Sequence, residues 1–155
     1  MSAPRVRVLV VDDSALMRKL IPQILERDSS IEVVGTAMDG NFGLKKIEEL
    51  KPQVITLDLE MPGMNGIDML RQVMRKLYPV PVIVVSSHST EGASINLKAL
   101  GFGAFDFVGK PRDVSTRMPE IAAELISKIK AAANSKSVTI KPLASTMQYG
   151  KACVE

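Results

Sequence analysis

Four acidic residues follow two short apolar segments of the chain. They are Asp12, Asp13, Asp58 and Glu60. The first pair comes directly after Val6–Val11, and the second pair comes after Val54–Leu57. Carboxylates that share one site repel one another unless a cation offsets their charge. Mg²⁺ suits such a site because it binds carboxylates, water and phosphate oxygens. We therefore expect Asp12, Asp13 and Asp58 to bind Mg²⁺.

A hydroxyl group and an amine lie at the ends of two further apolar segments. Ser86 ends the apolar segment Val82–Ser86, and Lys110 follows Phe105–Val108. A metal-held carboxylate that faces an ammonium group can attack a phosphoryl group as a nucleophile. The protein then mainly positions groups and offsets charge. We expect Asp58 to accept a phosphoryl group whose three oxygens are bound by Lys110, Mg²⁺ and the Ser86 hydroxyl.

These residues can meet only if the segments that carry them lie side by side. Apolar, β-branched segments alternate with helical patterns, which is typical of a parallel α/β sheet. The predicted strands are Val6–Val11, Glu32–Ala37, Val54–Leu57, Val82–Ser86 and Phe105–Val108. The predicted helices are Ala15–Arg27, Phe42–Lys51, Ile67–Leu77, Glu91–Leu100 and Pro119–Ala133. Doubly wound sheets bind ligands at the carboxyl ends of their strands, where the candidate residues fall.

Two stretches depart from this regular pattern. Pro22 lies inside the first predicted helix, where it removes a hydrogen bond and should kink the helix. After Ala133 the helical periodicity ends. We expect one domain over residues 1–133, followed by a linker or flexible tail over residues 134–155.

The positive charge of the chain lies outside the region of the candidate site. The net charge is +3, yet residues 1–113 hold 14 basic and 14 acidic side chains, and residues 114–155 hold 6 basic and 3 acidic ones. No aromatic or groove-reading motif accompanies this charge, so we expect no nucleic-acid partner. No apolar run approaches the ~20 residues of a membrane helix. The single Cys153 and the lack of a signal-peptide pattern predict a cytoplasmic protein.

Each candidate residue also has an ordinary structural explanation. Asp13 or Ser14 could cap the first helix, and an isolated Asp at a strand end is often a turn former. The combination of groups at four strand ends is what favours phosphoryl chemistry. His88 is interpreted as a loop residue, because no Gly-x-Ser-x-Gly motif accompanies it. A phosphatase of the haloacid-dehalogenase type is an alternative, but it requires Asp-x-Asp after the first strand, where this chain has Asp12-Asp13.

Four motifs, taken in order, resemble the receiver domain of two-component response regulators. They are Val-Val-Asp-Asp-Ser (10–14), Thr-Leu-Asp-Leu-Glu-Met-Pro-Gly-Met-Asn-Gly (56–66), Val-Val-Ser-Ser (84–87) and Gly-Lys-Pro (109–111). The resemblance covers residues 5 to about 130. It implies a flavodoxin-like (βα)₅ fold whose parallel strands have the order 2-1-3-4-5.

The same resemblance implies roles for the acidic residues. Asp58 would be the phosphoacceptor and a metal ligand. Asp12 and Asp13 would be the acidic pair that binds Mg²⁺, and Glu60 would contribute its backbone carbonyl. The phosphoryl donor would be a histidine kinase.

Further roles concern the response to phosphorylation. Lys110 would pair with the phosphoryl group, and Ser86 would be the switch hydroxyl. Phe107 would be the switch aromatic, at a position where many receivers carry Tyr. A cis peptide bond is implied before Pro111. The output would pass to an effector domain in cis, or to a protein partner, through the fourth helix, fifth strand and fifth helix.

A narrower resemblance is to the regulatory domain of the chemotaxis protein-glutamate methylesterases. It rests on Asp-Ser-Ala-x-Met-Arg (13–18), Val-Val-Gly-Thr-Ala-x-Asp-Gly (33–40), Leu-Glu-Met-Pro-Gly-Met (59–64) and Phe-Asp-Phe-Val-Gly-Lys-Pro (105–111). With one His and no nucleophile motif, we expect no esterase in this chain, which would catalyse only its own phosphoryl transfer and dephosphorylation. Two alternatives stay open: the regulatory part of a methylesterase, or a stand-alone receiver that acts as a phosphorylation-dependent binding module.

Overall fold

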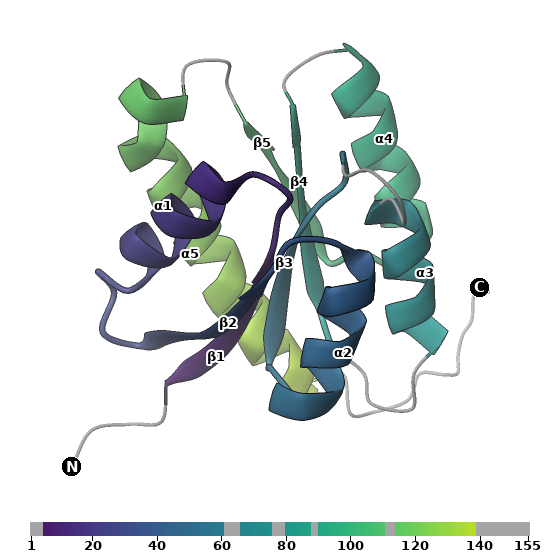
Figure 1. Ribbon diagram of the computed structural model, residues 1–155, viewed down its shortest axis with the longest axis horizontal. Helices are drawn as coiled ribbons and strands as arrows, with labels where there is room; N and C mark the ends of the chain where they lie inside the picture. The colour runs from purple at the N-terminus through teal and green to yellow at the C-terminus, as the bar shows by residue number, and fades with distance from the viewer. Residues whose placement is uncertain (1–4, 61–65, 76–79, 88–89, 111–113, 139–155) are drawn as a thin grey trace.

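A parallel sheet in the order β2-β1-β3-β4-β5 runs through the centre of the molecule (Figure 1). The computed structural model describes residues 5–60, 66–75, 80–87, 90–110 and 114–138. Its strands are β1 (Val6–Val11), β2 (Ile31–Ala37), β3 (Val54–Asp58), β4 (Val82–Ser87) and β5 (Asp106–Lys110). All strand pairs are parallel, so the predicted sheet and its strand order are confirmed.

Helices cover both faces of this sheet. They are α1 (Ala15–Leu25), α2 (Gly40–Leu50), α3 (Gly66–Arg75), α4 (Thr90–Gly101) and α5 (Val114–Val138). Helices α1 and α5 lie on one face, and α2, α3 and α4 lie on the other (Figure 1). Each predicted helix is present. Within the described residues, no helix is long and apolar enough to cross a membrane.

Helix α5 differs from its prediction at both ends. It begins five residues before Pro119 and ends five residues after Ala133. The sequence predicted a start at about Pro119, whereas the structure has this proline inside the helix. At the other end, Ala132 is fully buried and accepts a hydrogen bond from the Ser135 hydroxyl, at 2.9 Å. Ser135, two residues beyond the predicted end, is thus bonded to the preceding turn, and the helix continues to Val138.

The strands divide their side chains between two cores. In β1, Val8 and Val10 pack towards α1 and α5, whereas Leu9 and Val11 pack towards α2 and α3. Because both faces are covered, every one of these positions is apolar, as in other buried parallel strands. The result is a rigid centre from which the carboxyl ends of the strands project.

The first helix is capped by a side chain that follows β1. Ser14 is the N-cap of α1, and its hydroxyl accepts a hydrogen bond from the Met17 N–H at 3.2 Å. The helix passes through Pro22 and ends at Leu25, two residues before the predicted end. The kink at Pro22 stays a prediction. The cap fixes where α1 starts, and with it the turn that holds Asp12 and Asp13.

Candidate functional site

Three carboxylates converge where β1 and β3 end. The two strands are neighbours, with Val11 opposite Leu57, so the residues that follow emerge side by side. Carboxylate oxygens of Asp12, Asp13 and Asp58 lie within 4.8 Å of one another. Asp12 and Asp58 are only 1% and 3% exposed, whereas Asp13 is exposed. The structure thus brings together three of the four acidic residues identified in the sequence.

Lys110 faces this cluster from the end of β5. Its Nζ lies 3.6 Å from Oδ2 of Asp58 and 3.9 Å from Oδ2 of Asp12. Strand β4 separates β5 from β3 in the sheet, so the long side chain reaches across one strand. One ammonium group does not balance three carboxylates. The site therefore keeps a negative charge that favours a further cation.

Asp58 has the most perturbed environment of the three. Burial raises the pKa of Asp58 to about 7; the Lys110 ammonium opposes this rise and the Asp12 carboxylate adds to it. The backbone N–H of Glu60 donates to Oδ1 of Asp58 at 2.9 Å and favours the ionised form. A carboxylate must be ionised to act as a nucleophile or as a metal ligand. Any added positive charge at this site therefore makes Asp58 more available for either role.

The turn after β1 holds Asp12 in place. The backbone N–H of Ser14 donates to Oδ1 of Asp12 at 2.9 Å, and the Arg18 side chain donates to the Asp12 carbonyl at 2.8 Å. These bonds orient the carboxylate without neutralising it. The same turn provides the N-cap of α1, so Ser14 has the structural role that the sequence left open, through its hydroxyl.

Gly66 allows α3 to begin directly against the end of β3. A Cβ atom at this position would lie 2.4 Å from Cα of Leu59 and 2.7 Å from the carbonyl oxygen of Asp58. The Gly66 N–H lies 3.3 Å from the Leu59 carbonyl oxygen, to which it donates. A residue with a side chain would push this backbone away, so the glycine fixes the position of the segment next to Asp58.

Ser86 lies in β4 and is fully buried. Its hydroxyl donates to Oδ1 of Asn96 in α4 at 2.9 Å, and Asn96 is itself 3% exposed. Nothing in the sequence singles out Asn96. It stands in a helical pattern between Ile95 and Leu97 and belongs to no motif, so only its burial and its bond reveal it.

The remaining predicted residues have different surroundings. The Glu60 side chain is exposed, and its backbone N–H is the group that contacts Asp58. Phe107 in β5 is half-buried and packs against the core that contains α2, α3 and α4. His88, the peptide bond before Pro111, and Cys153 with the tail after residue 138 lie outside the described residues.

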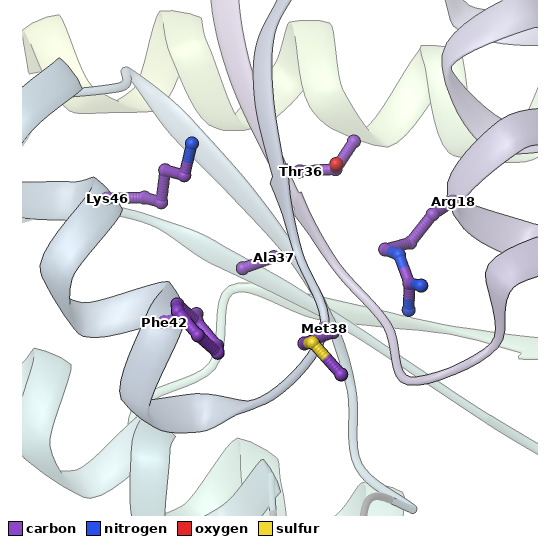
Figure 2. Close-up of a pocket in the computed structure, with 6 residues that line it drawn as sticks. All are labelled: Arg18, Thr36, Ala37, Met38, Phe42 and Lys46. Atoms are coloured by element: carbon purple, nitrogen blue, oxygen red, sulfur yellow. The ribbon is translucent and has the colours of Figure 1, made fainter.

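A pocket of about 220 Å³ lies at the end of β2 (Figure 2), and its lining residue Arg18 donates to the Asp12 carbonyl. It is lined by Arg18 of α1, by Phe42 and Lys46 of α2, and by the segment 36–38 between the two helices. None of the three carboxylates lines it. Its cations and apolar side chains contain no nucleophile or metal-ligand set, so the candidate chemistry belongs to the acidic cluster.

Comparison with known proteins agrees with this geometry. Residues 8–122 match the family model described as the response regulator receiver domain. A protein-glutamate methylesterase/protein-glutamine glutaminase 2 of Koribacter versatilis is 61% identical over 128 residues, which are 82% of this chain and 35% of the relative. The corresponding protein of Symbiobacterium thermophilum is 52% identical over 129 residues, 83% of this chain and 35% of the relative. The chain thus spans about a third of the length of these curated relatives.

Solved structures show the same likeness. The response regulator domain of Thermotoga maritima CheB superposes with a TM-score of 0.77 at 47% identity, covering 84% of this chain and 97% of that domain. The receiver domain of the putative response regulator NarL from Mycobacterium tuberculosis gives a TM-score of 0.69 at 35% identity, covering 83% of this chain and 98% of that domain. The chain therefore shares its fold with solved receiver domains and its sequence with the receiver region of protein-glutamate methylesterases.

Proposed function

This chain belongs to the response regulator receiver family, and from this premise we propose that Asp58 accepts a phosphoryl group from a histidine kinase with Mg²⁺ as cofactor. The chain is a receiver of the chemotaxis-methylesterase type that works in two-component signalling. One observation carries the assignment of the site. Asp58 is buried at the end of the central strand β3, within 4.8 Å of two further carboxylates and 3.6 Å from the Lys110 ammonium.

Mg²⁺ fits the donor set at this position. The three carboxylates supply hard oxygen ligands, which this ion prefers, and their combined charge exceeds what Lys110 offsets. We assign Mg²⁺ to the side chains of Asp12, Asp13 and Asp58 and to the backbone carbonyl of Glu60. When bound, the ion offsets negative charge on the carboxylates and on phosphoryl oxygens.

The chain's own residues then position the transfer. A carboxylate oxygen of Asp58 attacks phosphorus, the phosphorus–nitrogen bond to the donor imidazole breaks, and the imidazole leaves with that electron pair. Lys110 offsets charge on a phosphoryl oxygen from the far side of β4. The Ser86 hydroxyl donates to another oxygen after it has left Asn96. Attack of water on the phosphorus later releases phosphate and restores Asp58.

We assign the output to a methylesterase catalytic domain that contacts the face of α4, β5 and α5. Leu97 in α4 is 68% exposed, and Phe102 and Phe105 in the α4–β5 connection are exposed as well. Exposed apolar side chains are available for contact with a partner. The curated relatives are about three times as long as the matched region, which leaves room for such a domain.

The alternative is a stand-alone receiver that docks to a separate protein. The length of the complete reading frame decides between these two possibilities. The cytoplasmic location stays a proposal.

Phosphorylation by acetyl phosphate in the presence of Mg²⁺ tests the assignment. Intact-mass spectrometry should show one added phosphoryl group on the unaltered chain and none on Asp58→Asn. Asp39→Asn is the matched control: it removes one carboxylate from the N-cap of α2, outside the cluster, and Asn caps helices as well as Asp does. Equal labelling of Asp58→Asn would refute the proposal, and steady turnover of a generic phosphomonoester would favour the phosphatase alternative.

A further inference from the structure

Charged side chains hold both backbone polar groups of Phe107. Its N–H donates to Oδ1 of Asp106 at 2.7 Å, and its carbonyl oxygen accepts a hydrogen bond from Nζ of Lys128 in α5 at 2.5 Å. The Lys128 ammonium also lies 5.4 Å from the centre of the Phe107 ring, within the range of a cation–π contact. One α5 side chain therefore contacts both the backbone and the ring of this residue.

The Lys128 side chain is itself held in place. Its Nζ donates to Oε2 of Glu124, one turn earlier in α5, at 2.8 Å, and lies 3.6 Å from Oδ1 of Asp106. The ammonium group therefore donates hydrogen bonds to the Phe107 carbonyl and to Glu124, and it forms a longer ion pair with Asp106. Lys128 is only 24% exposed, so its bonds are less weakened by water than those of a fully exposed pair. The cluster Asp106–Glu124–Lys128 thus connects α5 to β5 at Phe107.

Phe107 stands between two parts of the molecule. Its ring packs against the core beneath α2, α3 and α4, whereas its neighbour Val108 packs against the core beneath α1 and α5. A shift of β5, or a rotation of the Phe107 ring, would change the distances from the Lys128 ammonium to the Phe107 carbonyl and ring. Hydrogen bonds from a charged donor are short and directional, so a small displacement of the carbonyl weakens this one.

We propose that Lys128 is a positioning residue that transmits the position of Phe107 to α5. This inference rests on the proposed function, because Phe107 has a signal to transmit only if phosphorylation moves it. In this arrangement α5 does not sense the phosphoryl group directly. It senses whether the Phe107 carbonyl and ring stay within reach of the Lys128 ammonium, and the Glu124 and Asp106 carboxylates determine how readily the ammonium leaves.

The test follows two ¹⁹F NMR probes upon addition of Mg²⁺ and beryllofluoride. The chain has four Phe residues, all replaced by 4-fluorophenylalanine, and the Phe107 signal is assigned with Phe107→Leu. The second probe is a trifluoromethyl tag on Ala131→Cys, an exposed position in α5, with Cys153→Ser. In the otherwise unaltered protein, both signals should shift on binding.

The decisive variant is Lys128→Met. We expect its Phe107 signal to shift still, its beryllofluoride affinity to stay within about twofold, and the shift at residue 131 to fall by at least half. Lys128→Arg should restore that shift, because a guanidinium also donates to a carbonyl and stacks on a ring. Lys130→Met is the matched control: it removes a positive charge two residues away whose partner is Asp28, remote from β5, and it should leave the shift at residue 131 intact.

Several outcomes would overturn the inference. They are a full shift at residue 131 in Lys128→Met, no shift there in the unaltered protein, or a large loss of beryllofluoride affinity in Lys128→Met, which would place Lys128 in binding itself. If Lys128→Met does not fold, as judged by circular dichroism, Lys128→Gln repeats the comparison. Failure of the unaltered protein to bind beryllofluoride would refute the proposed function, and this inference with it. If the protein binds beryllofluoride but the signal at residue 131 does not depend on Lys128, only this inference is refuted.

Discussion

The Ser86 hydroxyl donates its hydrogen bond to Oδ1 of Asn96 at 2.9 Å, between β4 and α4, and both side chains are buried. A serine hydroxyl has a single proton to donate. It therefore serves either Asn96 or an oxygen of a phosphoryl group on Asp58, but not both. If Asp58 is phosphorylated as proposed, this step would be linked to a contact of α4, because Ser86 would have to release Asn96 before it binds a phosphoryl oxygen.

Removal of Asn96 should strengthen phosphoryl-analogue binding. In Asn96→Ala the Ser86 hydroxyl no longer has to leave this partner, and a neutral hydrogen bond contributes about 1 kcal/mol net. We expect beryllofluoride, with Mg²⁺, to bind about fivefold more tightly, measured by isothermal titration calorimetry. The same variant should lose about 1–3 kcal/mol of unfolding free energy, because a buried side chain is truncated and a partner loses its bond.

A double-mutant cycle with Ser86→Ala isolates the cause of that gain. Ser86→Ala alone should weaken beryllofluoride binding, and adding Asn96→Ala to it should bring no further change. The interaction energy of the cycle then belongs to the Ser86–Asn96 pair. If Asn96→Ala tightens binding equally in the absence of the hydroxyl, competition for Ser86 is not the reason.

Asp13 offers a way to weaken the proposed Mg²⁺ site with little damage to the fold. It is the exposed member of the cluster, so Asp13→Asn removes a charge and buries no new group. We expect the affinity for Mg²⁺ to fall at least tenfold in calorimetry. The metal-free protein should be as stable as before or slightly more so, because one carboxylate fewer repels Asp12 and Asp58. Asp39→Asn should change neither quantity, and a comparable loss in both variants would argue against a local effect.

The raised pKa of Asp58, about 7 in the folded protein against 3.8 as its ordinary value, gives stability a definite pH dependence. Between these values the folded chain binds more protons than the unfolded chain, so the unfolding free energy falls as the pH rises from about 4 to about 7. At about 1.4 kcal/mol per pKa unit, we expect a loss on the order of 3 kcal/mol between pH 5 and pH 8 in the metal-free protein. Mg²⁺ should reverse it at pH 8, and Asp58→Asn should remove this component. Thermal unfolding at pH 5 and pH 8, with and without Mg²⁺, provides the measurement. The prediction would be contradicted if, in metal-free buffer, the unaltered chain became more stable from pH 5 to pH 8 when compared with Asp58→Asn.

The sequence predicted the sheet and the meeting of Asp12, Asp13, Asp58 and Lys110 because both depend on local patterns. Strands covered on two faces must be apolar throughout, and residues after parallel strands must emerge at one edge. Each strand end could therefore be read independently. The cluster of three carboxylates and the ion pairs of Lys110 agree with that prediction.

Asn96 and Lys128 could not be predicted, because their roles depend on contacts between elements. Asn96 looks like an ordinary helix residue until α4 is placed over β4. Lys128 looks like half of an i, i+4 pair with Glu124 until α5 is placed beside Phe107. The end of α5 was missed because the apolar periodicity stops at Ala133, whereas the helix continues to Val138 and its residue Ser135 bonds back to the Ala132 carbonyl.

Gly66 should be intolerant of a side chain, since a Cβ atom there would approach Cα of Leu59 to 2.4 Å. The contact is with backbone, which cannot rotate away, so Gly66→Ala must move α3 or the end of β3. We expect a loss of about 3 kcal/mol in unfolding free energy and weaker Mg²⁺ binding, because Asp58 adjoins the displaced segment. Gly101→Ala is the matched control: a Cβ atom at the end of α4 would meet nothing within 4 Å, so stability should stay within about 1 kcal/mol. Chemical denaturation and calorimetry measure both variants. Equal stability of the two would mean that the close approach at Gly66 does not fix the segment beside Asp58.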